Sequence, residues 1–299
     1  MSTNAAKPNV NGNTLKSKMM SNLQGMIGEK GMMMSTIIML VLAGIFVIII
    51  IVIYIVSKVK KNKLNQIVLQ QDVIQIDNSK EVPFLIKDST MSSVSLGQEF
   101  SFSFWIYLGP QYQATTGHKM ILQRGSGDTK NATLNKSTNP AFFMDKSTNK
   151  MYIALATNKV SGSYKIDDIL TSNNTGFIVT TIDYVPLQRW VNICLAVRDN
   201  NGYVFMDGDM YSVISVNDVA MMSSAATSRP IISGTNGDAM IGNRLNTTNG
   251  FVAYASYFNY ALTQTQLRTI YQKGPYPSTF LSYFGFGNYA WRTPLYRID

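Results

Sequence analysis

A run of twenty uncharged, strongly apolar residues constrains this chain more than any other feature. It spans Ile37–Val56 and reads IIMLVLAGIFVIIIIVIYIV. At about 1.5 Å of rise per residue, a helix of this length covers roughly 30 Å, the thickness of the hydrocarbon core of a bilayer. A buried core helix seldom extends this far without a polar residue, and a secretory signal has a shorter apolar run and a small-residue cleavage site. We therefore expect one transmembrane helix over residues 35–57.

The charges that flank this run predict its orientation. Fewer lysines lie shortly before the run than shortly after it. The four that follow it are Lys58, Lys60, Lys61 and Lys63. The positive-inside rule then places the large C-terminal domain in the cytosol. The same lysines either meet anionic headgroups at the membrane surface, at about 1 kcal/mol each, or only stop transfer. N-glycosylation sequons argue against this orientation; they lie at Asn131, Asn135, Asn173 and Asn246.

Charge balance and cysteine content narrow the class of the remaining chain. The formal net charge is +9, but residues 81–299 carry only 17 basic against 14 acidic side chains. No Lys/Arg-rich run occurs there, so we expect no nucleic-acid partner. Cys194 is the only cysteine, which excludes an intramolecular disulfide, and its apolar surroundings favour a buried thiol. The lack of disulfides agrees with a domain in the cytosol.

Changes in composition divide the rest of the chain into four segments. Residues 1–30 are rich in Asn, Ser, Lys and Gly, which predicts a flexible arm with at most a short helix at Leu15–Ile27. Residues 58–80 form a basic juxtamembrane connector, which we expect to be helical to about Gln71 and then extended. Over residues 81–274 the apolar pattern changes to a period of two, and residues 275–299 form an aromatic tail.

The period of two predicts an all-β domain. Aromatic residues alternate with smaller ones along Phe100–Ile106, and further apolar runs are separated by turn sequences such as Asp199-Asn-Asn-Gly, which joins two strands as a hairpin. Strands are expected at 100–106, 119–123, 151–155, 176–182, 190–198, 202–206 and 250–258. One helix is expected at Thr263–Gln272, capped by Thr263 and stopped by Gly274. Many short strands with polar turns indicate an antiparallel sandwich.

Three stretches of this region follow a known pattern. Phe100–Leu108 is an early aromatic strand, and Trp190–Gly208 gives a Trp, an apolar strand, a polar turn and a strand that ends in Asp-Gly. Gly250–Gly274 gives a Gly-led strand, a corner, a short helix and a Gly, with Asn259, Ala261 and Leu262 at the corner. Together, over about 190 residues, they resemble the laminin-G-like, concanavalin-A-like jelly-roll family. The resemblance implies an antiparallel jelly-roll sandwich behind the transmembrane helix.

One departure from this family bears on ligand binding. The family's closing strand often carries an acidic pair near a calcium or sugar site, whereas Ala253 and Tyr254 stand in those places here. The resemblance therefore does not imply a calcium-dependent lectin. Asp207 and Asp209 are the remaining candidate calcium ligands, but the intervening Gly208 favours a turn.

The acidic and nucleophilic residues form no catalytic pattern. Jelly-roll glycosidases need two carboxylates about 5–9.5 Å apart, and neither Glu81 nor Glu99 has a suitable neighbour. The only histidine, His118, lies in a polar stretch, so neither a Ser-His-Asp set nor a Cys-His pair can be assembled. No phosphate-binding glycine loop or metal-ligand spacing occurs. We expect a non-enzymatic protein without a cofactor.

The tail carries eight aromatic residues within 25 positions. Such side chains bury large areas and are enriched at protein contacts. The tail either folds back over its own sandwich or docks onto a neighbouring subunit. In the second case Trp291 and Arg292, with Tyr289 and Phe286, are the candidate anchors.

Two functions from different classes remain. The membrane anchor, the Asn-, Ile-, Lys- and Met-rich composition and the missing disulfides are similar to membrane-associated laminin-G-like proteins of large DNA viruses. That resemblance implies a structural protein of the virion, a minor capsid or internal-membrane component. Its sandwich would bridge the bilayer to capsid or other membrane-associated proteins. The alternative is a membrane-anchored carbohydrate-binding module, in which Trp105, Tyr107 and Tyr112 contact a glycan.

Overall fold

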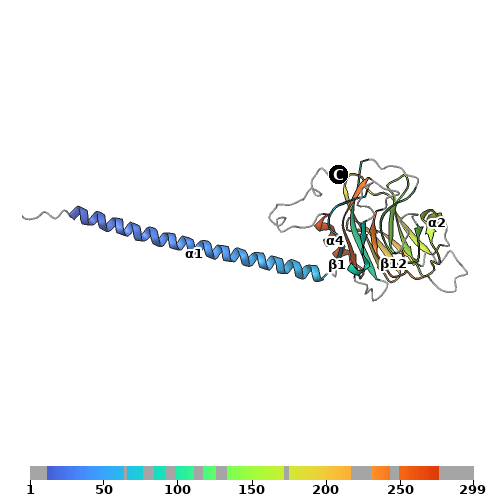
Figure 1. Cartoon of the computed structure of the whole chain (residues 1–299), viewed down its shortest axis with the longest axis horizontal. Coiled ribbons are helices and arrows are strands. Elements are labelled where there is room, and N and C mark those ends of the chain that lie inside the picture. Colours follow the sequence, from blue (N-terminus) through green and yellow to red (C-terminus); the bar gives the residue numbers. More distant parts are fainter. Residues whose placement is uncertain are drawn as a thin grey trace, which may run out of the picture. The chain divides into compact units, whose positions relative to one another are not determined.

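A computed structural model of the chain shows one long helix and one β-sandwich (Figure 1). It describes residues 12–63, 66–76, 84–91, 99–110, 117–125, 133–171, 175–216, 230–242 and 249–275. The chain divides into two compact units, Met1–Lys63 and Leu64–Asp299.

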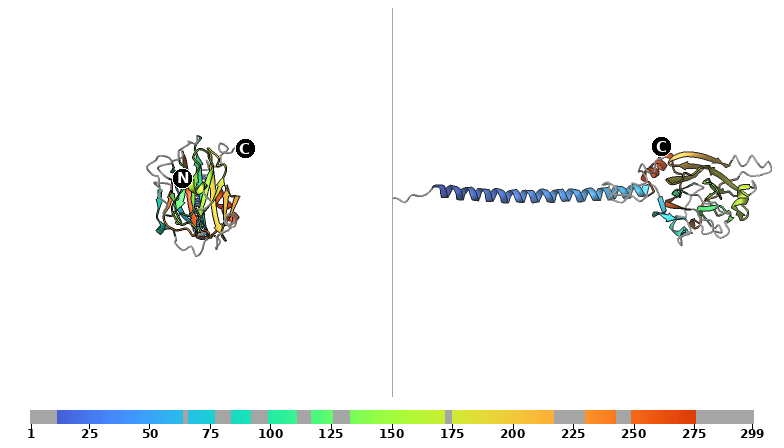
Figure 2. Two further views of the ribbon diagram at one scale, coloured as in Figure 1. Left: turned by 90° about the vertical axis from the view of Figure 1, so that its right-hand side faces the viewer. Right: turned by 90° about the horizontal axis from the view of Figure 1, so that it is seen from above.

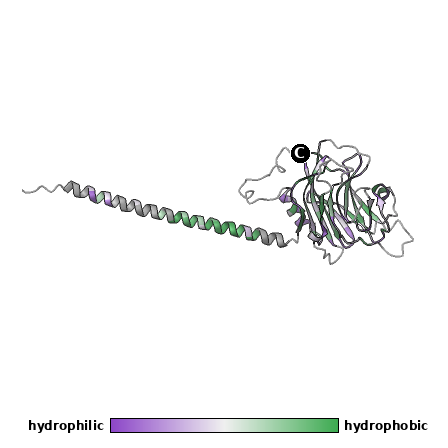
Figure 3. Cartoon of the chain, viewed as in Figure 1, coloured by the Kyte–Doolittle hydropathy of each residue, from purple (hydrophilic) through white to green (hydrophobic). Residues whose placement is uncertain are grey.

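The first unit contains α1 (Gly12–Lys63), a continuous helix of 52 residues. Within it, Ile37–Val56 is the one stretch of the described chain that is long and apolar enough to cross a membrane, and Figure 3 shows it as a green band. None of this stretch is buried inside the protein. Lipid would provide the apolar surroundings that these side chains lack. From Gly12 onward, the helix replaces the flexible arm that we expected, because no proline after Pro8 interrupts a helix that extends N-terminally from the apolar run.

The second unit is a sandwich of two antiparallel sheets, which confirms the expected fold class. Sheet A has the strand order β1-β15-β4-β11-β12-β13, and β2 also pairs with β15. Its strands are β1 (Gln66–Gln70), β2 (Ile74–Gln75), β4 (Phe100–Leu108), β11 (Trp190–Arg198), β12 (Asn201–Met206), β13 (Asp209–Ser215) and β15 (Gly250–Phe258).

Sheet B has the order β10-β8-β7-β5-β14-β3. Its strands are β3 (Phe84–Ile86), β5 (Lys119–Arg124), β7 (Ala141–Met144), β8 (Met151–Ala156), β10 (Phe177–Ile182) and β14 (Ala239–Ile241). The smaller elements are a 3-10 turn, η1 (Asp88–Thr90), the strand pair β6 (Thr133–Leu134) and β9 (Tyr164–Lys165), and the helices α2 (Ile166–Thr171) and α4 (Gln264–Lys273).

The connector after α1 joins the sandwich almost at once. α1 ends at Lys63, and β1 and β2 both pair with β15. The expectation of a helix to Gln71 is therefore wrong after Lys63. The β-branched Ile67 and Val68 pair with β15, and Leu69, at the irregularity in register between Val68 and Gln70, is buried in the core between the sheets.

The core forms where the inner faces of the two sheets meet. Phe104 of β4 contacts Phe142 of β7 edge to face, with ring centroids 5.0 Å apart. The alternation along β4 therefore places Phe100, Phe102, Phe104 and Ile106 on its inner face, between the sheets.

The outer faces of both sheets are also covered, by α4 over sheet A and by α2 over sheet B. The two helices lie on opposite sides of the sandwich (Figures 1 and 2). β4 is consequently buried on both faces. The outward-facing Ser101 of β4 satisfies two backbone groups. Its Oγ donates to Tyr260 O and accepts from Leu262 N, both at 2.9 Å. These two hydrogen bonds fix the corner of the chain before α4.

α4 begins after Thr263, the cap that the sequence predicts, and the structure adds a capping box with Gln266. Thr263 Oγ1 accepts from Gln266 N, the Gln266 side chain accepts from Thr263 N, and Gly274 ends the helix with φ of 78°. We expect Thr263→Ala to lower the free energy of unfolding by about 1 kcal/mol. Thr269→Ala, at an exposed position inside the same helix, should cost less. Urea unfolding measures both, and equal losses would contradict a capping role.

Candidate functional site

Exposed apolar side chains of the sandwich gather at one corner. Of the seven large apolar side chains that are exposed in its described part, four lie on β13 or beside it. We call these four the β13 edge surface: Tyr184, Met210, Tyr211 and Val213. Ion pairs flank them, Asp183 with Lys150 at 3.0 Å and Asp209 with Arg268 at 2.9 Å. An apolar, aromatic centre with a charged rim is the usual anatomy of a protein interface.

A β-bulge shapes this corner. Val204 pairs with Ser212 but Phe205 pairs with Met210, so Tyr211 is the extra residue. Its hydroxyl accepts a hydrogen bond from the backbone N–H of Asp183 at 3.0 Å. The bulge therefore turns Tyr211 towards the end of β10, where the edges of the two sheets meet.

β13 is also an edge strand. Among the described residues it pairs with β12 alone. Edge strands commonly carry lysine, proline or a bulge that discourages pairing with another chain. β13 has the bulge, but no charged residue or proline occurs from Met210 to Val216. We did not predict this surface, although the uncharged, β-prone run after Asp209 was a usable signal.

Three aromatic side chains form a row across the outer face of sheet A. Tyr107 of β4 lies between Trp190 of β11 and Phe251 of β15, at ring-centroid distances of 5.7 and 6.0 Å. The strand register places all three opposite one another. We call them the aromatic row; each is half-buried. One of the expected glycan contacts, Tyr107, therefore lies in a group of rings.

The other two expected glycan contacts do not join this row. Trp105 is fully buried, and its indole stacks on Tyr271 of α4 with 5.6 Å between centroids and 17° between planes. The expectation that Trp105 contacts a glycan is wrong, because α4 covers it. Tyr112 lies outside the described residues. Period two gives Trp105 and Tyr107 the same face, but it does not show where α4 packs.

The carboxylates of Asp207 and Asp209 each pair with a different arginine. Asp207 has φ of 54° in the turn between β12 and β13, and its carboxylate accepts from Asn192 N at 2.8 Å and pairs with Arg189 at 2.9 Å. Burial raises the pKa of Asp207. Asp209 instead pairs with Arg268 of α4. No group of three His, Cys, Asp or Glu side chains comes together in the described chain.

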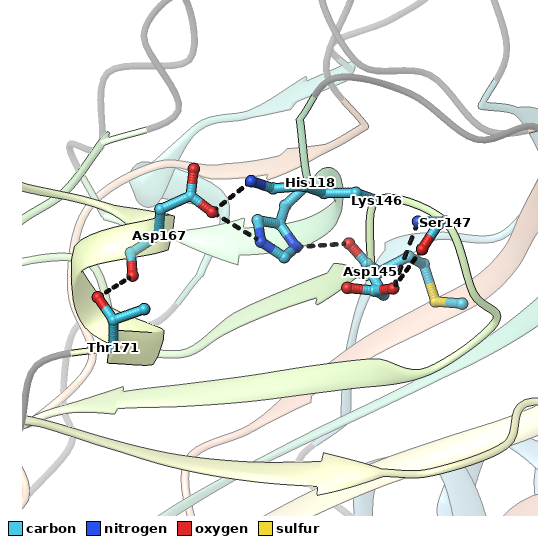
Figure 4. A network of polar contacts seen from close by, with 7 residues as sticks. His118, Asp145, Lys146, Ser147, Asp167 and Thr171 are labelled. Carbon is cyan, nitrogen blue, oxygen red and sulfur yellow. Dashed lines mark hydrogen bonds and ion pairs between the residues drawn. The ribbon is translucent and has the colours of Figure 1, made fainter.

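The histidine belongs to a polar network that holds α2 to sheet B (Figure 4). His118 is buried, with Nε2 3.2 Å from Asp167 Oδ1 and Nδ1 3.3 Å from the carbonyl oxygen of Met144. Lys146 Nζ lies 2.6 Å from the same Asp167 oxygen and lowers the pKa of that carboxyl. Ser147 Oγ contacts Asp145. These contacts tether α2 to the ends of β5 and β7.

The turn that joins β7 to β8 contains a carboxylate with a lowered pKa, that of Asp145. Burial raises the pKa of Asp145, but hydrogen bonds from the Thr148 hydroxyl and from the backbone N–H groups of Ser147, Thr148 and Lys146 outweigh it, so the pKa falls to about 2. Because the unfolded carboxyl takes up its proton near 3.8, this stabilisation is present above that pH and is lost as the pH falls towards 2.

We therefore expect Asp145→Asn to be less stable than the wild type at pH 7 and to lose less stability between pH 5 and pH 2. Thermal unfolding followed by circular dichroism across this range measures the difference. Parallel curves for the two proteins would contradict the assignment.

Several expected site residues cannot be placed. Lys58, Lys60, Lys61 and Lys63 belong to the end of α1, but the structure does not describe their side chains. The tail anchors lie outside the described residues altogether: Phe286, Tyr289, Trp291 and Arg292. Both groups stay predictions.

Solved structures with a similar arrangement are binding domains of botulinum neurotoxins. The serotype G domain is 15% identical with a TM-score of 0.45, and covers 68% of this chain and 45% of its own. The serotype D domain is 10% identical with a TM-score of 0.46, and covers 70% and 52%. A neurotoxin DC domain in complex with rat synaptotagmin II is 11% identical with a TM-score of 0.43, and also covers 70% and 52%. The match thus spans about half of each of these chains. No protein-family model and no curated protein matches this chain.

Proposed function

We propose that this chain is a non-enzymatic, membrane-anchored assembly protein. In this proposal α1 spans a bilayer through Ile37–Val56, and the sandwich binds a second protein through the β13 edge surface. The observation that carries it is the concentration of exposed apolar and tyrosine side chains on and beside an edge strand that has no charge or proline from Met210 onward. Stable interfaces place such residues at their centre and charged pairs at the rim.

The setting of this assembly rests on the sequence resemblance. The resemblance to membrane-associated laminin-G-like proteins of large DNA viruses implies a minor capsid or internal-membrane component. Such a component bridges a bilayer and a protein shell. The four lysines after the apolar run support a cytosolic, capsid-facing sandwich. Protease protection in sealed vesicles tests the orientation. Co-purification of the chain with intact particles tests the setting.

Site-specific photocrosslinking tests the docking surface. A photoreactive phenylalanine replaces Val213 in the full chain, and the matched control replaces Leu85, an exposed apolar residue on the edge strand β3. We expect the membranes in which the chain resides to yield one discrete adduct from position 213 and none from 85. Val213→Lys should weaken that association about tenfold, because the charge remains unpaired in a desolvated contact. Equal adducts from both positions would overturn the proposal.

A glycan-binding function is the second candidate, and the aromatic row favours it. Adjacent half-buried rings offer faces on which sugar rings can pack. A glycan array, read with and without calcium, tests this candidate. Saturable binding that Tyr107→Ser abolishes would support the glycan function in place of assembly. No binding, together with the adduct from position 213, would support assembly.

A further inference from the structure

α4 runs along β4 and ends where the aromatic row begins. Its N-terminal side is fixed where Leu262 N donates to Ser101 Oγ, and near its C-terminal end Tyr271 stacks on Trp105. Eight residues of helix advance about 12 Å, and four residues of strand about 13 Å. The helix therefore follows the strand in the direction of increasing residue number.

The aromatic row is the next feature on this path. Tyr107 lies two residues beyond Trp105 on the same face of β4, about 6.6 Å further along. Beyond Tyr271, α4 has only two residues before Gly274. Gly274 and Pro275 are both buried, so the described chain ends against the protein surface just after α4.

The sequence after Pro275 is rich in aromatic side chains, which can pack on such a row. Five of its eight aromatic residues fall within eleven positions after Pro275: Tyr276, Phe280, Tyr283, Phe284 and Phe286. Aromatic pairs with centroids about 4.5–7 Å apart stabilise by about 0.5–1.5 kcal/mol beyond the burial of their area. We propose that residues 276–286 pack on the aromatic row of their own chain and extend the cover that α4 provides over sheet A.

The covalent connection favours the chain's own tail over that of a second copy. Residue 276 directly follows the buried Pro275, so the covalent link keeps residues 276–286 within reach of the sandwich. A short flexible link gives an effective concentration in the millimolar range. A tail from another copy has no comparable advantage.

This arrangement gives the two halves of the tail different roles. Residues 276–286 occupy the row, and Trp291 and Arg292 remain available as anchors for a partner. A covered row would not accept a glycan. The β13 edge surface is a different surface, so the packing of the tail and the binding of a partner can fail independently.

Limited digestion with chymotrypsin tests the packing in the full chain held in detergent micelles. Mass spectrometry follows cleavage after Phe280 and Tyr283, neither of which precedes a proline. We expect the double variant Tyr107→Ser with Phe251→Ser to speed this cleavage about tenfold, because it removes the contacts that close the segment. The matched control, Met210→Ser with Val213→Ser, alters exposed apolar residues of the same sheet and should leave the rate unchanged.

A second measurement does not depend on the folding of those variants. In a chain that stops at Pro275, iodide should quench tryptophan fluorescence more strongly than in the full chain carrying Trp291→Phe, because Trp190 becomes more accessible while Trp105 stays under α4. Added peptide of residues 276–299 with the same Trp291→Phe change should reverse the effect.

Three results would overturn the proposal. One is identical quenching in the truncated and full chains. Another is cleavage at the tail sites that is equally fast in the wild type and in the row variant. The third is protection that disappears on roughly 100-fold dilution, which would assign the contact to a second copy.

Discussion

Deletion of residues 37–56 should move the chain from the membrane pellet to the soluble fraction. Sixteen of these twenty residues are Leu, Ile, Val or Phe, each favouring insertion by about 0.3–0.6 kcal/mol. Their sum, about 5–10 kcal/mol, corresponds to a partition ratio of more than a thousandfold. Carbonate extraction of membranes, followed by blotting of pellet and supernatant, measures the change.

Paired arginine substitutions compare two charges placed inside the apolar run with the same two charges placed elsewhere on α1. Phe46→Arg with Ile49→Arg places two charges near the centre of the run, at a cost of about 5–7 kcal/mol, and should release most of the chain. Met19→Arg with Met20→Arg adds the same charges to exposed positions of α1 outside the run and should leave the chain in the pellet. Membrane retention of the deletion variant would contradict a spanning role for α1.

Gly125→Ala should lower the free energy of unfolding of the sandwich by about 4 kcal/mol or more. Gly125 has φ of 105°, a region that residues with a Cβ rarely adopt. A Cβ at this position would lie 1.7 Å from the backbone oxygen of Ser137. The strand β5 and the segment before β7 would have to separate, and the hydrogen bond from Gly125 N to Asp238 O would be disturbed.

The matched control for this change is Gly234→Ala. Gly234 has no heavy atom within 4 Å of an added Cβ and is not among the glycines with positive φ. We expect its free energy of unfolding to change by less than about 1 kcal/mol. Urea unfolding in detergent, followed by tryptophan fluorescence, compares both variants with the wild type. Equal midpoints for the two variants would contradict the steric explanation.

The strands with a clear period of two could be predicted from the sequence, and the short ones could not. The run Phe100–Ile106 has seven alternating residues, and the structure confirms it as part of β4. β14 has only three residues, and β3 is equally short. Such strands show too few repeats to display a period, because their pairing with β5 and with each other decides their conformation.

Side-chain exposure was harder to predict than strand location. Trp105 and Tyr107 share a face of β4, yet one is fully buried and the other half-buried. The difference arises because α4, which lies far along the chain from β4, ends between them. The β13 edge surface was missed for a related reason. Whether Met210 and Val213 are core or surface residues depends on which strand lies at the edge, and a strand order is not visible in a local pattern.

The cover that α4 provides over Cys194 makes the thiol an intrinsic probe of conformational opening. Cys194 is fully buried in the cluster that α4 forms with the outer face of sheet A, and burial raises its pKa. A thiol reagent can react only after the helix lifts or the domain unfolds. The alkylation rate of the unmodified protein, measured against denaturant, would therefore report how often this layer detaches, with no engineered label.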